Sequence, residues 1–498
     1  MQSHSEIIAK LQAAETTDTL ADLFKNPAFC EVYPLLRQKV VGENTAAMVG
    51  QSAGFQRKGR LASLADILRH ELNPVNFRRK HPVDLLFLSY STSRLFGLPK
   101  GWPDVYAEPF LKTAEARGLR GDILEVPAAG EYRMPRLRPG HLIGLDEIRA
   151  RVWSKLRPVA PVLRYEVEAC RQVFLKQGLI AESIAPAHWP ALWSYFSHRR
   201  AIFTRQLRRL KPKLAIVINW YGTTCMALTS AAQGLGIPAA DLQHGAQGLD
   251  DSIYGPWETP PTFSTMMPCG WLNWTVHDKA NLETWLGPHQ RSYVCGIPWH
   301  QLASDLLADS VDFDVLKEAA GTRPIVLVSL QPNSTPLLDY LQKVLAQPGA
   351  DQFSWAVRCH PGNVNQIDQV AARFAGNANV LPVWAATFVP LSMVLSISAA
   401  HLSVFSSVVL EAAASNVPSV LSEDFGQVFF DHLGPDLLAV ATDPAEMVPS
   451  IQALIARSKI ASGVNDTASV AAAIDAIWQD VTEGRLTTQP PVEQRNHS

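Results

Sequence analysis

The C-terminal half of the chain alternates short apolar runs with helical stretches, and this alternation limits the fold more than any other feature. Strand-length runs occupy residues 325–330, 353–358, 380–383, 401–405, 419–421 and 437–441, and stretches with helical spacing follow most of them. Apolar runs of this length, bounded by turn residues, are typical of strands that are buried on both faces. The pattern predicts an α/β fold in which six parallel strands are joined by right-handed helical crossovers.

The N-terminal half repeats the alternation less regularly. Residues 83–88, 122–126, 214–219, 237–242 and 293–295 predict strands, and the long segment 145–213 between them predicts helices. A chain of 498 residues is too long for one ordinary core, so two Rossmann-like domains that face a cleft are expected. The predicted boundaries are a helical N-terminal extension at 1–80, an N-terminal domain at 81–298, a C-terminal domain at 299–485 and a disordered tail at 486–498.

Charge and composition exclude several classes of function. The chain carries 44 basic and 46 acidic residues, so no overall field attracts it to nucleic acid. It has no leader-like N-terminus, and no apolar run reaches the roughly 18 residues of a membrane span. A cytoplasmic protein is expected. The basic stretch 199–213 indicates either a solvated helix face or a peripheral contact with the inner face of the membrane or an acidic glycan.

Polar loops follow the predicted strands of the C-terminal domain. Ser406 and Ser407 stand where a strand runs into a helix, and their hydroxyls and the helix-start N–H groups suit a phosphate. Pro361 ends another strand and keeps His360 at the sheet edge, where ligands of open α/β sheets bind. The candidate donor-side residues are Gln331, Arg358, His360, Pro361, Ser406, Ser407 and Glu411. No Gly-x-Gly-x-x-Gly, Gly-Lys-Ser/Thr or metal-ligand motif occurs, which argues against dinucleotide redox chemistry, P-loop hydrolysis and a required metal.

Two loops of the N-terminal domain also follow predicted strands, as the polar loops of the C-terminal domain do. The segment 241–245 ends one predicted strand, and the hydroxyl-rich segment 89–94 ends another. The candidate catalytic residues are His244, Asp241 and Asp250, and the candidate acceptor-side residues are Ser91, Ser93, Arg94 and Gln243. An ordinary histidine has a pKa near neutrality, which suits a general base.

The order of these motifs resembles a known family. Gln-His-Gly at 243–245, Gln-Pro at 331–332, His-Pro at 360–361 and Ser-Ser-x-x-x-Glu-Ala at 406–412 are similar to motifs of the bacterial GT-B glycosyltransferases of capsule and lipopolysaccharide assembly. The resemblance covers roughly residues 83–456 and is closest to capsule-synthesis Kdo transferases. More distantly, the chain resembles bacterial sialyltransferases and CDP-glycerol glycerophosphotransferases. The resemblance implies a metal-independent enzyme whose C-terminal domain holds an activated sugar, with His360, Ser406 and Ser407 at the CMP or CDP phosphate and Glu411 nearby.

The chain departs from the family pattern beside His244. Gln243 stands where the glycerophosphotransferases have tryptophan, and the lysine that usually follows is missing. Either His244 deprotonates the acceptor hydroxyl, or it orients that hydroxyl while Asp241, Asp250 or Asp251 takes the proton. The expected activity is transfer of a sugar such as Kdo or a sialic-type acid from a CMP-linked donor to a surface polysaccharide or lipid-linked acceptor. The alternatives are a CDP-polyol phosphotransferase and a non-catalytic GT-B-like assembly subunit. No cofactor is expected besides the nucleotide-sugar co-substrate.

Overall fold

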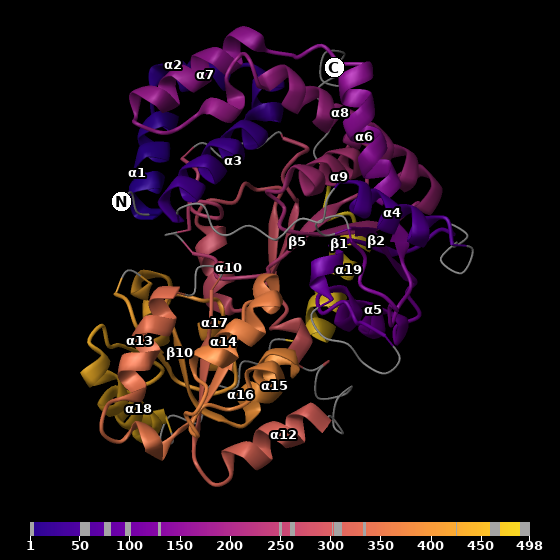
Figure 1. The fold of residues 1–498 in the computed structure, drawn as a ribbon. Helices are drawn as coiled ribbons and strands as arrows, with labels where there is room; N and C mark the ends of the chain where they lie inside the picture. The colour runs from indigo at the N-terminus through magenta and orange to yellow at the C-terminus, as the bar shows by residue number, and fades with distance from the viewer. Residues whose placement is uncertain are drawn as a thin grey trace.

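The computed structural model describes residues 4–49, 60–73, 81–94, 101–127, 131–248, 251–258, 264–300, 302, 311–331, 335–424, 426–458 and 469–488. These residues form two lobes, each built on a parallel sheet with helices on its faces (Figure 1). The predicted α/β class and the two sheets are therefore confirmed. The domain boundaries differ from the predicted ones, because helices from both ends of the chain pack into the N-terminal lobe.

The N-terminal sheet has seven parallel strands in the order β3-β2-β1-β4-β5-β6-β7. Their bounds are β1 (Leu85–Tyr90), β2 (Gly121–Val126), β3 (His141–Leu142), β4 (Leu214–Ile218), β5 (Ala239–Leu242), β6 (Gly270–Asn273) and β7 (Arg291–Val294). The sequence predicted neither β3 nor β6. A two-residue strand has no detectable period, and β6 follows a Pro- and Trp-rich segment that obscures it.

The first helices of the chain belong to the core of the N-terminal lobe. They are α1 (His4–Glu15), α2 (Asp18–Leu23), α3 (Pro27–Val49) and α4 (Arg60–Glu71). Leu11 and Leu36 share one hydrophobic cluster with Leu86 and Val217 of the sheet. The segment predicted as an extension therefore contributes to the folding core, at least over residues 4–49. The helices α6 (Gly144–Leu156), α7 (Arg164–Lys176), α8 (Trp189–Leu210) and α9 (Thr223–Gln233) complete this lobe.

Helix α3 also anchors the loop at residues 252–256. Arg37 is fully buried and paired with Glu15 at 2.8 Å. The same guanidinium donates to the carbonyls of Ser252 and Pro256, each at 3.2 Å. Gln38 donates to the carbonyl of Ile253 at 3.1 Å. A buried charge is retained only when it is paired and hydrogen-bonded, so these contacts fix the backbone of residues 252–256.

The C-terminal sheet has five parallel strands in the order β12-β11-β10-β8-β9. They are β8 (Ile325–Ser329), β9 (Ser354–Arg358), β10 (Ser398–Ser403), β11 (Ser419–Leu421) and β12 (Leu438–Val440). The sixth strand, predicted at 380–383, is wrong: only Val380 bridges to Trp355, and α15 (Val383–Phe388) follows at once. Pro382 has no N–H to give to a ladder and stands at the N-cap position of this helix.

The helices of the C-terminal lobe are α12 (Val311–Ala320), α13 (Thr335–Leu345), α14 (Ile367–Arg373), α15, α16 (Leu391–Ser396), α17 (Val408–Ala414) and α18 (Pro444–Ser458). The last helix, α19 (Val470–Thr482), returns to the N-terminal lobe and lies beside α5 (Ala107–Glu115) (Figure 1). Ile474 and Ile477 share a core cluster with Phe87 and Ile216. The predicted domain 299–485 thus includes a helix that packs on the other domain, since an amphipathic pattern does not show which lobe a helix faces. Leu486 is buried, and residues 489–498 of the predicted tail lie outside the described residues.

The basic stretch 199–213 is divided between the interior and the surface. Arg199 is buried against Glu147 and Thr224, whereas Arg205, Arg208 and Arg209 are exposed on α8. Among the described helices, none is both long and apolar enough to cross a bilayer.

Candidate active site between the two domains

A cavity of about 590 Å³ lies between the carboxyl ends of the two sheets. Its size falls within the range of roughly 300–1,000 Å³ that is typical of small-molecule sites. The polar residues from the N-terminal lobe are Tyr90, Thr92, Ser93, Tyr106, Arg133, Asn219, His244 and Asp251, and those from the C-terminal lobe are Ser329, Arg358, Cys359, His360, Ser392, Ser406, Ser407 and Glu411. Most of the predicted donor-side residues are therefore brought together. Gln331 is the exception, since Ser329 and Leu330 line the cavity and Gln331 does not.

The Ser406–Ser407 turn joins β10 to α17 and faces the cavity. Ser406 Oγ accepts from the N–H of Val408, the first residue of α17, at 3.3 Å, whereas Ser407 at the N-cap position makes no side-chain capping bond. The N–H groups of Val409 and Leu410 donate to the carbonyls of Ser406 and Ser407, each at 3.0 Å. The expectation that the helix-start N–H groups receive a phosphate is therefore wrong for these three residues, because their donors are already used. The hydroxyls themselves remain at the cavity wall.

Arg358 and His360 extend from the end of β9 on the same wall. The Nη1 atom of Arg358 donates to the carbonyls of Ala386 at 2.7 Å and Val389 at 2.5 Å, which fixes the guanidinium. Burial lowers the pKa of Arg358 to about 10, so it remains a cation at neutral pH. Burial also lowers the pKa of His360, so its neutral form is favoured there. Arg358 is therefore the positive charge of this wall, and His360 contributes a neutral imidazole.

Glu411 connects α17 to the passage between the lobes. Its side chain is almost fully buried, and Oε2 accepts from Trp299 Nε1 at 2.6 Å. Trp299 in turn packs edge-on against Tyr106, with ring centroids 5.0 Å apart. Glu411 lines the cavity, so it can contact a ligand. Its hydrogen bond to Trp299 also connects α17 to the segment between the two lobes.

His244 and Asp251 face these groups from the N-terminal lobe. Tyr221 Oη lies 3.2 Å from His244 Nε2, and His244 Nδ1 is a buried atom without a hydrogen-bond partner among the described residues. Burial lowers the pKa of His244 to about 4, which makes it a weak base. Burial raises the pKa of Asp251 to about 6, against two backbone N–H bonds that lower it. Asp251 is therefore the better base near neutral pH.

Asp241 and Gln243 do not reach the cavity. Asp241 is 1% exposed, and its two oxygens accept from the N–H of Trp220 and the hydroxyl of Tyr254, each at 2.9 Å. Gln243 is fully buried, donates to the carbonyl of Gly245 at 2.8 Å and accepts from the N–H of Trp274 at 2.6 Å. The predictions of catalysis by Asp241 and of acceptor contact by Gln243 are thus corrected. Gln243 holds the loop that presents His244, and Asp241 ties the end of β5 to Trp220 and Tyr254. Asp250 lies outside the described residues.

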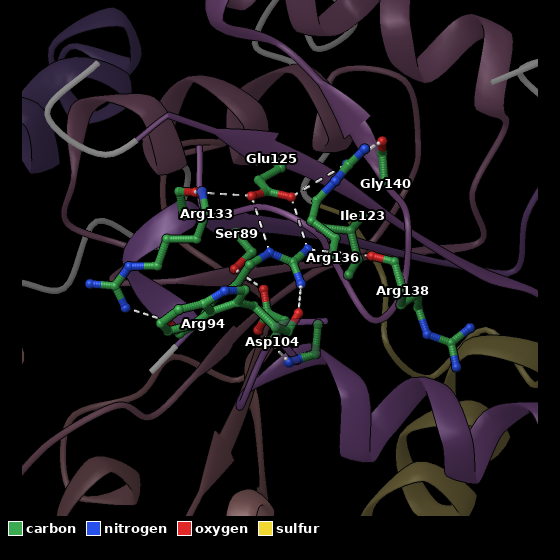
Figure 2. Close-up of polar contacts among 12 residues, drawn as sticks. Ser89, Arg94, Asp104, Ile123, Glu125, Arg133, Arg136, Arg138 and Gly140 are labelled. Atoms are coloured by element: carbon green, nitrogen blue, oxygen red, sulfur yellow. Dashed lines mark hydrogen bonds and ion pairs between the residues drawn. The ribbon is translucent and has the colours of Figure 1, made fainter. Parts of the chain in front are cut away.

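Of the three predicted acceptor-side residues at 91–94, only Ser93 lines the cavity. Ser91 and Arg94 are buried around Glu125, as Figure 2 shows for Arg94. Arg94 donates to both oxygens of Glu125, at 3.1 and 2.8 Å, and Ser91 Oγ donates to Glu125 at 3.1 Å. Arg94 and Ser91 do not reach the cavity because the carboxylate of Glu125, inside a buried strand, requires a charged partner, and Arg94 is that partner.

The cavity residues that the sequence did not single out include Tyr106, Arg133, Asn219 and Ser392. Arg133 lies in an irregular segment without a recognisable motif, so the sequence offered no signal for it. Within the described ranges, no group of three or more His, Cys, Asp or Glu side chains is placed to hold a metal ion.

Comparison with known proteins relates the chain to others by structure alone. No family model matches the sequence, and no curated protein sequence matches it significantly. The UDP-GlcNAc 2-epimerase from Neisseria meningitidis, solved bound to UDP-GlcNAc, is 13% identical with a TM-score of 0.51, over 80% of this chain and 100% of that chain. MnaA from S. aureus, solved with UDP, is 12% identical with a TM-score of 0.51, over 82% and 99%. The calicheamicin glycosyltransferase CalG4 is 14% identical with a TM-score of 0.42, over 81% and 99%.

At these identities the similarity shows the fold and no activity. The chain is an α/β protein of two Rossmann-like domains that face a cleft, the architecture it shares with the two structures at a TM-score of 0.51.

Proposed function

We propose that the protein is a glycosyltransferase that binds a nucleotide-activated sugar in the cleft and transfers the sugar to an acceptor hydroxyl. One observation carries the proposal: a single cavity has a cation and several hydroxyls on its C-terminal wall and a carboxylate with a raised pKa on its N-terminal wall. Transfer needs both halves, since the departing nucleotide gains negative charge while the attacking hydroxyl loses a proton.

The C-terminal wall fits the phosphate of the donor. A guanidinium held by two carbonyls and the hydroxyls of Ser406 and Ser407 are donors for phosphate oxygens, and the imidazole of His360 adds a further donor. Donors fixed in advance stabilise the charge that develops on a leaving group without reorganisation. Among the described residues that line this wall, Arg358 is the one arginine, and no lysine joins it. We therefore favour a CMP-linked donor, which has one phosphate, over a nucleoside diphosphate.

The N-terminal wall fits the proton transfer. In the proposed reaction, the acceptor oxygen forms a bond to the sugar carbon, its proton passes to Asp251, and the nucleotide leaves with the electrons of the broken bond. His244, neutral at pH 7, orients the acceptor through Nδ1 or Nε2. A positioned base of this kind contributes roughly 10²–10⁴-fold to the rate.

The sugar and the acceptor are proposed from the motif resemblance. A 3-deoxy-ulosonic acid such as Kdo, or a sialic-type acid, transferred to a surface polysaccharide or lipid-linked glycan, is the substrate pair that those motifs support. The fold is also that of UDP-GlcNAc 2-epimerases, so epimerisation of a nucleotide sugar is the second candidate. The two differ in their products: a transferase releases free nucleotide, and an epimerase returns an intact nucleotide sugar.

Nucleotide binding is tested by thermal unfolding with CMP, CDP, UDP and GDP. A ligand at a hundred times its Kd adds about 2.7 kcal/mol, and we expect CMP to give the largest rise in Tm at equal concentration. His360→Ala and Ser407→Ala are each expected to reduce this rise, because both side chains line the donor wall.

Arg457→Gln, on the exposed face of α18, is the matched control and should respond to CMP as the wild type does. The donor site is wrongly assigned if no nucleotide raises the Tm, or if both cavity variants respond to CMP like the wild type.

A further inference from the structure

A second cavity of about 330 Å³ adjoins the first and is also lined by both lobes. Four residues line both cavities: Arg133 from the N-terminal lobe, and Arg358, Cys359 and Pro361 from the C-terminal lobe. The cavities therefore meet at two arginines that come from opposite lobes. The remaining lining of the second cavity is mostly apolar or aromatic: Trp102, Tyr132, Met134, Val364, Thr387 and Phe388. Among the described residues that line it, none is a carboxylate.

Arg133 is held in place by the buried network around Glu125 (Figure 2). Its backbone N–H donates to Ser91 Oγ at 2.9 Å, and its guanidinium donates to the carbonyl of Arg94. The guanidinium also lies over the ring of Trp102, 5.4 Å from the centroid, and the carbonyl of Trp102 accepts from Arg94 at 2.6 Å. Ser91 and Arg94, which the sequence predicted as acceptor contacts, are thus positioning residues that act through Arg133.

The charge of this network is unbalanced. Glu125 already pairs with Arg94 and, at 3.5 Å, with Arg136, so it does not neutralise Arg133. Glu131, two residues away along the chain, is the carboxylate that interacts with Arg133, yet burial still lowers the pKa of Arg133. Glu411 interacts with Arg358 in the same way, yet burial lowers the pKa of Arg358 to about 10. Two partly desolvated cations that line a shared opening favour an anion between them, and guanidinium groups bind carboxylates in a bidentate manner.

We propose that Arg133 and Arg358 form an anion subsite for the carboxylate of an acidic sugar, with the apolar second cavity receiving the rest of that sugar. This proposal rests on the proposed function and adds to it the residues that select for the carboxylate: sugars that carry a carboxylate are bound there, and neutral sugars are not. The carboxylate belongs either to the sugar of the donor or to an acidic residue of the acceptor.

The test compares Arg133→Gln with the wild type in binding free sialic acid, CMP-sialic acid, CMP and UDP-GlcNAc, measured by titration calorimetry. Loss of one charged hydrogen-bond pair weakens binding about 10- to 100-fold. If the donor sugar carries the carboxylate, we expect this loss of affinity for free sialic acid and for CMP-sialic acid, and no change in the affinity for CMP. If the acceptor carries it, CMP-sialic acid binding stays constant, while the KM for an acidic oligosaccharide acceptor rises by the same factor.

Arg133→Lys keeps the charge and is expected to recover part of the affinity, and Ser91→Ala is expected to give a smaller loss than Arg133→Gln. Arg205→Gln, exposed on α8, is the matched control. The subsite is refuted if Arg133→Gln, folded as judged by an unchanged Tm, binds every acidic ligand and acceptor like the wild type, or if it weakens CMP equally. Failure of CMP to bind the wild type would instead count against the donor assignment, because the free sugar acid tests the subsite without it.

Discussion

Asp251→Asn is expected to lower kcat for sugar transfer by about 10²–10⁴-fold, with little change in the affinity for CMP. Asp251 lines the cavity opposite the donor wall, and its Oδ1 accepts from the N–H of Ile253 at 2.8 Å, a bond that asparagine also makes. Burial raises the pKa of this carboxyl to about 6, so its charged form is disfavoured in the folded state. Replacement by a neutral isostere therefore should not lower the Tm, and a loss of rate reports chemistry rather than unfolding.

The pH dependence separates Asp251 from His244. An acid must be deprotonated to act as a base, so kcat/KM of the wild type should rise as pH increases through about 6 and then level off. If His244 were the base, the rise would lie near pH 4. Asp351→Asn, at an exposed position, is the control and should keep both rate and profile. A rate for Asp251→Asn within threefold of the wild type would show that the proton goes elsewhere.

Glu125→Gln is expected to destabilise the protein by about 3–5 kcal/mol, the largest stability change proposed here, because it leaves buried positive charge without its partner. The side chains of Arg94 and Glu125 are fully buried, and that of Arg136 is 2% exposed. The loss can be measured as a lower midpoint of urea unfolding at an unchanged m-value. Since Glu125 supports the backbone around Ser91 and Arg133, weaker binding of acidic sugars should accompany it.

The matched control removes a carboxylate from an exposed arginine pair. Asp475→Asn breaks the 2.5 Å contact between Arg117, just after the end of α5, and Asp475 on α19, and an exposed pair of this kind contributes little to stability. The double variant Arg94→Met/Glu125→Leu should cost less than Glu125→Gln, since one buried arginine rather than two then loses Glu125 as its partner. Similar costs for Glu125→Gln and Asp475→Asn would contradict the assignment of a buried network.

The sequence predicted the fold well wherever a strand was buried on both faces. The runs 214–219 and 325–330 are apolar except for Asn219 and Ser329, and they contain the strands β4 and β8 of the structure. The segment 380–383 has the same apolar character, but Pro382 turns it into a helix start. The sequence could not predict that α19 packs against α5 of the N-terminal lobe, because its apolar face would fit either lobe.

The candidate site was predictable on the C-terminal wall and much less so on the other. His360, Ser406 and Ser407 follow regular strands, so their position at the sheet edge follows from the pattern. Asp241 lies near the end of a strand and Arg94 follows one, yet their burial depends on partners distant in sequence, namely Tyr254 and Glu125. A local motif shows which side chains lie near the edge of a sheet. It does not show which of them are already engaged in structural hydrogen bonds and ion pairs.

Product analysis with wild-type protein and Asp251→Asn tests the transferase proposal most directly. Each is incubated with CMP-sialic acid, UDP-GlcNAc and a mixture of acidic bacterial oligosaccharides, and the products are resolved by mass spectrometry. The wild type is expected to release CMP while one oligosaccharide gains the mass of one acidic sugar, and Asp251→Asn should do neither at a comparable rate. Return of the nucleotide sugars unchanged or as epimers, with no free nucleotide, would contradict a transferase.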